Sequence, residues 1–163
     1  MLKFLLILPV ALGGLVLLAG QAGLLRGQAP TDLGLRDGRF KPPSKTPNSV
    51  SSQTDLWPDH PQAADARIAP LALVGDGKDG PATLARIEAL VRATPGAEVV
   101  KRESDYLYST FTTRLMKYTD DVEFWFDPAA AVVQVRSASR LGGKDFGVNR
   151  ARIEALRTQL AAR

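Results

Sequence analysis

The stretch "DDVEFWFDPAAAVVQVRS", residues 120–137, contains two alternating runs on either side of a turn. Every second residue of each run is apolar: Val122, Phe124 and Phe126 in the first, Val133 and Val135 in the second. A period of two residues is typical of a β-strand that buries one face. Asp127 and Pro128 between the runs are typical of a turn. The stretch therefore predicts an antiparallel β-hairpin.

The polar positions of this hairpin define the second face of the predicted sheet. If Phe126 pairs with Ala131, antiparallel counting places Asp121 opposite Arg136. We therefore expect an ion pair between Asp121 and Arg136 on an exposed face. The same face is expected to carry other outward side chains of neighbouring strands: Tyr106, Tyr108, Glu123 and Trp125.

Further strands and two helices flank the hairpin in the sequence. Residues 97–102 and 105–116 predict strands, because apolar and polar residues alternate along the second of them. Residues 80–96 and 148–163 predict helices, each with an apolar stripe at helical spacing: Leu84, Ile87, Leu90 and Val91 in the first, Ile153, Leu156 and Leu160 in the second. Arg150 and Glu154 are expected to form an i,i+4 ion pair.

The order of these elements predicts an α+β fold with a domain over residues 67–163. We expect a two-layer sandwich, in which two helices pack on one face of an antiparallel sheet of three to five strands. Residues 26–66 are rich in Pro and Ser and predict a linker and strap. Within them, "TPNSVSSQ", residues 46–53, predicts either a turn pinned by side-chain hydrogen bonds or a polar ligand loop.

Residues 1–25 form an apolar segment before the domain. No charged residue lies between Phe4 and Leu25, and about 20 apolar residues suffice for a helix to cross a bilayer. We expect an N-terminal transmembrane helix, with a cleaved signal peptide as the alternative. The basic residues that follow favour a cytoplasmic domain, whereas the signal-like start favours export. We expect the domain to face the periplasm.

The composition excludes several classes of site. The chain of 163 residues contains no cysteine and a single histidine, His60, so we expect no metal site, no thiol nucleophile and no Ser-His-Asp triad. Seven of the 21 Lys and Arg residues lie in residues 136–163, against two acids. A basic segment of this kind suits an anionic partner. No nucleic-acid recognition motif accompanies it, so we expect no nucleic-acid binding.

The densest polar stretch is "RSASRLGGKDFGVNR", residues 136–150. Its arginines lie close in sequence to the start of a helix, where cations oppose the helix dipole. They therefore either pair with Asp120, Asp121 and Asp145 in a buried network, or bind an anionic ligand such as a carboxylate, a phosphate or a lipid headgroup.

Three motifs together resemble a known family. "TPNSVSSQ", "DDVEFWF" and "RSASRLGGKDFGVNRARIEAL", in this order, resemble the domain of unknown function 1499 over residues 33–162. The resemblance implies a signal or membrane segment in bacterial members and no particular activity. Many members carry a Cys where this chain has Ser49, so no thiol role is carried over. The matching motif residues are Asn48, Ser51, Ser52, Asp120, Asp121, Arg136, Ser137, Ser139, Arg140, Asp145, Gly147, Asn149 and Arg150.

These observations favour an accessory or binding module, anchored by a single pass in a bacterial inner membrane. The expected partners are the membrane, an anionic amphiphile or a membrane protein, without a cofactor. The alternatives are a structural subunit of a membrane complex and a hydrolase-type enzyme that uses Asp120, Asp121 and the arginines. We expect no catalytic residue, and the candidate ligand-binding residues are Asn48, Ser51, Ser52, Asp120, Asp121, Arg136, Arg140, Asp145, Asn149 and Arg150.

Overall fold

The computed structural model describes residues 2–75 and 79–162. Along the chain it contains the helices and strands α1 (Leu2–Gln21), β1 (Ser49–Ser51), η1 (Thr54–Leu56), α2 (Ala63–Ala66), β2 (Leu71–Ala72), α3 (Gly80–Ala93), β3 (Ala97–Arg102), β4 (Tyr106–Thr112), β5 (Thr119–Asp127), β6 (Val132–Ser139) and α4 (Val148–Ala161). The two long predicted helices and the four predicted strands at residues 97–139 are confirmed.

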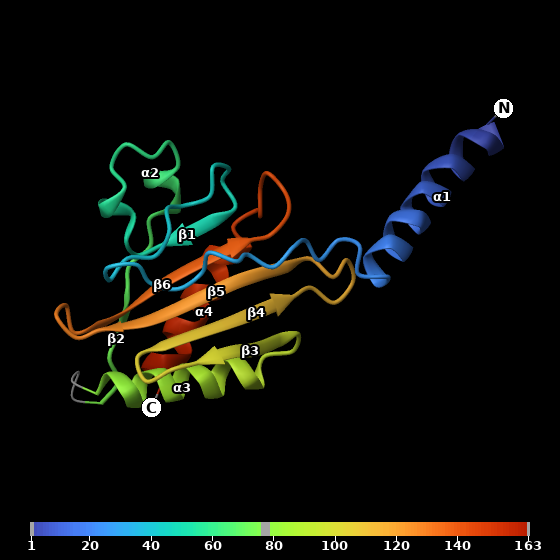
Figure 1. The fold of residues 1–163 in the computed structure, drawn as a ribbon. Coiled ribbons are helices and arrows are strands. Elements are labelled where there is room, and N and C mark those ends of the chain that lie inside the picture. The colour runs from blue at the N-terminus through green and yellow to red at the C-terminus, as the bar shows by residue number, and fades with distance from the viewer. Residues whose placement is uncertain (1, 76–78, 163) are drawn as a thin grey trace.

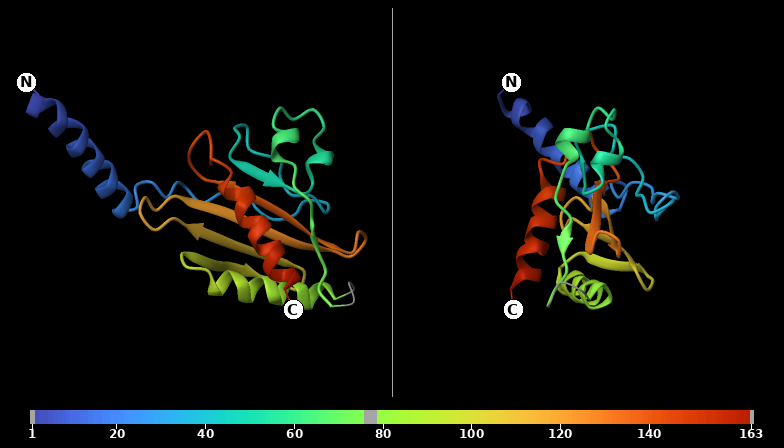
Figure 2. Two further views of the ribbon diagram at one scale, coloured as in Figure 1. Left: turned by 180° about the vertical axis from the view of Figure 1, so that it is seen from behind. Right: turned by 90° about the vertical axis from the view of Figure 1, so that its left-hand side faces the viewer.

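The strands form one antiparallel sheet in the order β1-β6-β5-β4-β3, and β2 pairs with the opposite end of β6 from β1. Helices α3 and α4 lie on the same face of this sheet (Figures 1 and 2). The predicted α+β architecture is therefore confirmed, although the sheet has six strands instead of three to five. The periodicity of the sequence does not predict β1, because Ser49, Val50 and Ser51 are all buried and apolar and polar residues do not alternate between two faces.

The register of the β5–β6 hairpin differs from the predicted one. Phe126 pairs with Val133, so Asp121 lies opposite Ala138 and Glu123 lies opposite Arg136. The connecting turn is shifted by one residue, because Asp127 pairs with Val132 and residues 128–131 connect the strands. The Asp127 side chain accepts hydrogen bonds from the N–H groups of Ala129 and Ala130, both at 3.1 Å. A shift of two residues leaves every side chain on its predicted face. Only the cross-strand partners change.

The helix face of the sheet holds the apolar core. It contains the predicted stripes and strand positions: Leu84, Ile87, Val91, Leu107, Phe111, Val122, Phe124, Val133, Val135, Ile153, Leu156 and Leu160. At the start of α3, the Asp79 carboxylate accepts the N–H of Ala82 at 2.8 Å and caps the helix. In α4, Glu154 bonds to Arg157 at 2.9 Å, whereas Arg150 donates to the carbonyl of Asp65. The expected Arg150–Glu154 pair is therefore replaced by Arg157–Glu154.

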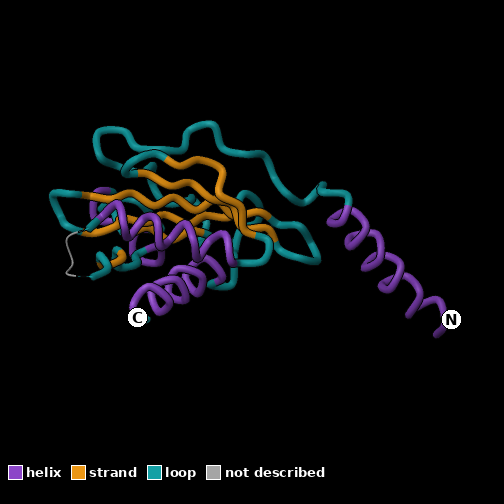
Figure 3. The backbone as a smooth tube through the Cα atoms, turned by 90° about the horizontal axis from the view of Figure 1, so that it is seen from below, coloured by secondary structure: helices purple, strands orange, loops and turns teal. Residues whose placement is uncertain are grey.

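The opposite face of the sheet is covered by residues 30–43, which we call the strap. Figure 3 shows the sheet between this segment and the helices. Phe40 is only 1% exposed, and its N–H donates to Gln53 Oε1 at 2.8 Å. Tyr106, Glu123 and Arg136 are buried beneath the strap. The prediction that this face is exposed is wrong, because residues assigned to a linker pack on it.

Helix α1 projects from the body of the protein (Figure 1). Within the part of the chain that the structure describes, no helix is long and apolar enough to cross a membrane. The predicted N-terminal transmembrane helix is therefore not supported.

Burial of Phe40 predicts that the strap contributes to folding. Phe40→Ala should lower the free energy of unfolding by about 3–5 kcal/mol, because it leaves a cavity between the strap and the sheet. Chemical denaturation measures the loss. Leu56→Ala, at an exposed position of η1, should cost less than about 1 kcal/mol. Equal effects of the two substitutions would show that the strap is not part of the folded domain.

Candidate functional site

Strand β5 carries three buried carboxylates, and each is paired with an arginine. Asp120, Asp121 and Glu123 are 5%, 2% and 0% exposed. The three pairs are Arg152 Nη2–Asp120 Oδ2 at 2.6 Å, Arg140 Nη2–Asp121 Oδ1 at 2.7 Å and Arg136 Nη1–Glu123 Oε2 at 3.6 Å. Buried charges of this kind are tolerated only when they are paired and hydrogen-bonded.

The sheet separates these pairs into two networks. Asp120 points to the helix face, where Arg152 of α4 reaches it. Asp121 and Glu123 lie opposite Ala138 and Arg136 and belong to the strap face. Asp120 and Asp121 therefore share no site, as expected for neighbours in a strand. The predicted cluster is split between the two faces.

Asn149 is the centre of the helix-face network. Its side chain is fully buried and donates to the carbonyl of Asn48 at 3.1 Å, Ser139 Oγ at 3.0 Å and Asp145 Oδ2 at 2.8 Å. Its Oδ1 accepts from Arg152 Nη1 at 2.8 Å and from the hydroxyl of Ser137. One amide thus joins α4 to β6 and to the residue before β1.

Asp145 fixes the loop that leads into α4. Its carboxylate accepts the N–H groups of Gly147 at 3.0 Å and Asn149 at 2.9 Å. Burial disfavours the charged carboxylate, but the hydrogen bonds from Asn149 and Gly147 outweigh it and lower the pKa of Asp145. The ionised Asp145 therefore stabilises the start of α4.

On the strap face, two nitrogens of Arg140, Nε and Nη2, donate hydrogen bonds to the Asp121 carboxylate. Arg140 Nε lies 3.1 and 3.0 Å from the two carboxylate oxygens, and this pairing raises the pKa of the guanidinium. The Tyr108 hydroxyl donates to Asp121 Oδ1 at 2.6 Å and accepts from Arg140 Nη2 at 3.2 Å. Burial, followed by the bond to Asp121, raises the pKa of Tyr108 to about 12. Tyr108 therefore stays a neutral donor at physiological pH.

The Glu123–Arg136 pair lies deeper, under the strap. Glu123 Oε1 accepts from the Tyr106 hydroxyl at 2.8 Å and from the Gly34 N–H at 2.7 Å. Burial raises the pKa of Glu123, although the Gly34 N–H and the Arg136 charge act in the opposite direction. Burial likewise lowers the pKa of Arg136. Among the described residues, Glu123 Oε2 and Arg136 Nε have no hydrogen-bond partner.

The remaining predicted residues also make contacts within the protein. Arg150 Nη2 donates to the Asp65 carbonyl at 2.8 Å, and Ser52 Oγ donates to Gln134 Oε1 at 2.7 Å. Ser51 Oγ accepts the N–H of Gln53 at 3.2 Å. These contacts support the interpretation of the polar stretch as a structural network. Binding of an anion by these arginines stays a prediction.

Four partners of the networks were not among the predicted site residues: Tyr106, Tyr108, Glu123 and Arg152. Alternation along residues 106–125 places Tyr106, Tyr108 and Glu123 on one face and is the signal that could have identified them. Within residues 2–75 and 79–162, no group of three or more His, Cys, Asp or Glu side chains is arranged to hold a metal ion.

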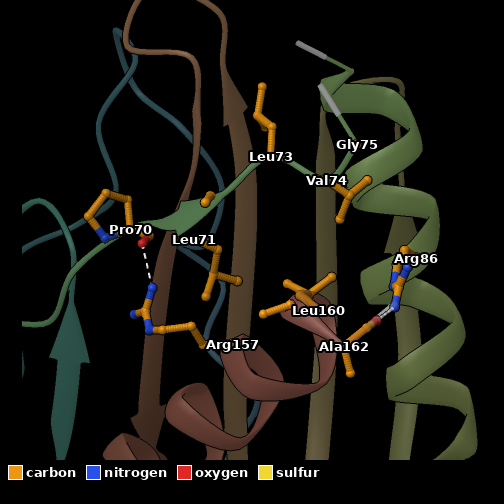
Figure 4. A pocket seen from close by; sticks show the side chains of 11 residues that line it. Pro70, Leu71, Leu73, Val74, Gly75, Arg86, Arg157, Leu160 and Ala162 are labelled. Atoms are coloured by element: carbon orange, nitrogen blue, oxygen red, sulfur yellow. Dashed lines mark hydrogen bonds between the residues drawn. The ribbon is translucent and has the colours of Figure 1, made fainter. Parts of the chain in front are cut away.

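A groove of about 790 Å³ lies at the other end of α4 (Figure 4). It runs between residues 70–75, the last turn of α4 and Arg86 of α3. Apolar side chains form much of its wall: Pro70, Leu71, Leu73, Val74 and Leu160. No pattern in the sequence predicts this groove, because its walls come from three separate segments.

Two guanidinium groups border the groove. Arg157 Nη1 and Nη2 donate to the carbonyls of Pro70 at 2.6 Å and Ala69 at 2.8 Å. Arg86 Nη2 donates to the carbonyls of Gln159, at 3.4 Å, and Ala162. Figure 4 shows both side chains at the groove. They hold residues 69–70 and the end of α4 in place.

Residues 39–160 match the family model described as "Protein of unknown function (DUF1499)". The chain belongs to this family. The resemblance in the three motifs is thereby confirmed. The DUF1499 match contains the three arginine–carboxylate pairs and most of the groove lining. No protein in a search of curated sequences matches this chain.

The buried Glu123–Arg136 pair predicts a large loss of stability when one partner is removed. Arg136→Met should lower the free energy of unfolding by about 3–5 kcal/mol, because the Glu123 carboxylate is left buried without a cation. Arg92→Met, which removes an exposed partner of Glu88, should cost less than about 1 kcal/mol. Urea denaturation measures both. The double variant Glu123→Gln, Arg136→Met should recover part of the loss; no recovery would argue against this account.

The lowered pKa of Asp145 predicts a pH dependence of stability. A carboxyl whose pKa is lower in the folded state stabilises the fold above its unfolded pKa, and this contribution is lost as the pH falls through the folded pKa. Asp145→Asn should therefore lower Tm at pH 7. The difference from wild type should shrink as the pH falls below the ordinary Asp value of 3.8. Asp59→Asn, on an exposed turn, is the control. A difference independent of pH would contradict the prediction.

Proposed function

We propose that this DUF1499 protein is a binding module that holds an anionic amphiphile, with an acidic head and an apolar tail, in the groove beside α4. The observation that supports it is the composition of the groove, an apolar wall with two guanidinium groups at its border. Its volume of about 790 Å³ lies within the range of about 300–1,000 Å³ that is usual for small-molecule sites.

The apolar side of the groove suits a hydrocarbon tail. Leu71 is fully buried and forms the floor, while Leu73 and Val74 are half-buried and border the opening. Each methylene of a tail that leaves water gains about 0.8 kcal/mol. A chain of several carbons that lies along these side chains would therefore supply most of the affinity.

The charge at the groove suits an acidic head. Arg157 forms an ion pair with Glu154, whereas the partners of Arg86 in the described part of the chain are backbone carbonyls. The local charge is therefore positive. A carboxylate or phosphate at Arg86 would form a charge-assisted hydrogen bond, which is stronger than the bond to a carbonyl.

The enzyme alternative receives less support from the geometry. Asp120 and Asp121 lie on opposite faces of the sheet, and each is buried against its own arginine. A pair of carboxylates that exchanges protons with one substrate needs both groups at the same site. The binding function is thus the better account of the described side chains.

The proposal includes action at a bacterial inner membrane, with the domain in the periplasm. Its support is the apolar surface of α1, on which Val10, Leu12, Leu15 and Leu18 are exposed. Exposed apolar side chains gathered on one helix mark a contact with lipid or with another protein.

Dodecanoate is a suitable probe of the groove. We expect the full-length protein to bind it, measured by titration calorimetry below the micelle concentration. Leu73→Trp should abolish binding because the larger side chain fills the groove, whereas Val100→Trp, on the exposed side of β3, should leave it unchanged. Arg86→Gln should weaken binding roughly tenfold. Equal binding of dodecylammonium, or no effect of Leu73→Trp, would refute the proposal.

A further inference from the structure

Two loops and the end of α1 meet at one end of the sheet. The β4–β5 loop, residues 113–118, and the β6–α4 loop, residues 140–147, lie on the side from which α1 leaves (Figures 1 and 2). The N–H of Arg140 donates to the Thr119 carbonyl at 3.1 Å and joins the bases of the loops. Gln21 Nε2 donates to the Leu115 carbonyl at 2.5 Å and joins α1 to the first loop.

This end of the protein exposes an unusual set of apolar side chains, which we call the docking face: Leu115, Tyr118, Leu141, Phe146 and Val148. Phe146 is 94% exposed and Leu115 is 62% exposed. Single exposed apolar residues are common on protein surfaces, but a group of them on adjoining loops marks an interaction site.

Phe146 is held outward by its backbone. Its φ is +53°, a conformation that is uncommon for residues other than glycine and costly for bulky ones. The carboxylate of Asp145 fixes this geometry by accepting the N–H groups of Gly147 and Asn149. The strain is not offset by burial of the ring. The loop geometry therefore serves to place the Phe146 ring outside the protein.

Four cations lie near the docking face in the sequence. Arg114, Lys117 and Lys144 lie on its loops, Arg26 follows the end of α1, and none of them forms an ion pair within the residues that the structure describes. The only acid on these segments is Asp145, whose carboxylate is engaged by the loop itself. Exposed apolar side chains together with unpaired cations are typical of surfaces that bind anionic lipid.

We propose that the docking face inserts into the interfacial region of an anionic lipid bilayer. Phe146 and Leu141 would enter the boundary between headgroups and acyl chains, and Tyr118 would lie at headgroup level, where aromatic side chains are enriched. The cations would contact the lipid phosphates. The apolar side chains of α1 continue from this face toward the same bilayer. This insertion requires neither the groove nor a membrane-spanning α1.

A site-specific fluorophore tests the proposal in the full-length protein. Because the chain has no cysteine, Val148→Cys carries a single NBD label at the docking face, and Leu56→Cys carries one on η1 as the control. With vesicles of phosphatidylcholine and about 30% phosphatidylglycerol, we expect a blue shift of the label at 148 alone, weakened by salt. Adding Phe146→Gly should raise about tenfold the lipid concentration that gives half of the blue shift. The Tm should stay unchanged or rise, because glycine accepts a positive φ.

Three results would overturn the proposal. An unchanged label at 148 on protein that sediments with the vesicles would show that α1 binds lipid without the docking face. A response insensitive to Phe146→Gly would exclude insertion of the ring. A blue shift that appears without lipid and grows with protein concentration would identify a second copy of the chain as the partner. Dodecanoate binding is measured without vesicles, so the two proposals can fail separately.

Discussion

Three carboxylates are buried on strand β5, and their need for cations determines how α4 and β6 are placed. Asp120, Asp121 and Glu123 of β5 each require a cation in a place from which water is excluded. Arg136 comes from β6, Arg140 follows directly after β6, and Arg152 comes from α4. The pairs therefore fix the position of α4 against the sheet and the position of β6 beside β5. Burial of apolar residues is non-directional, and alone it would specify the positions of α4 and β6 less closely than the ion pairs do.

The same constraint explains why residues 30–43 belong to the folded domain. Arg136 and Glu123 lie on the face opposite the helices, where a bare sheet would leave them in water. The strap covers them, and its Gly34 N–H supplies one of the hydrogen bonds that Glu123 needs. Phe40 completes the cover with an apolar ring. A segment rich in proline is suited to this task, because it crosses the sheet without requiring a strand ladder of its own.

Periodicity predicted β3 to β6, α3 and α4 because these elements carry their signal within a few residues. β1 and the strap were missed because their positions depend on contacts with β6 and β5, more than 60 residues away in sequence. The polar residues of 136–150 were identified as a cluster, and alternation along β5 places Asp120 and Asp121 on opposite faces. The partners of these acids were not predicted, because they depend on where α4 packs and on the register of β6. The error of two residues in the β5–β6 hairpin came from Ala131, whose φ of +51° places it in the turn, so that pairing begins at Val132.

The stiffness of the β6–α4 loop bears on how the docking face works. Asp145 bonds to the backbone of Gly147 and Asn149, and the Asn149 amide is itself tied to Asn48 and Ser139. Phe146 is thus presented by a loop that is already ordered, and little conformational entropy remains to be lost on contact. The 14 residues of α4, about 21 Å of helix, then separate this loop from the groove. An amphiphile that left the bilayer at the docking face would therefore have to move along the protein or back through the bilayer to reach the groove. Under the two proposals, the surfaces would act as separate sites, one that positions the protein and one that holds a ligand.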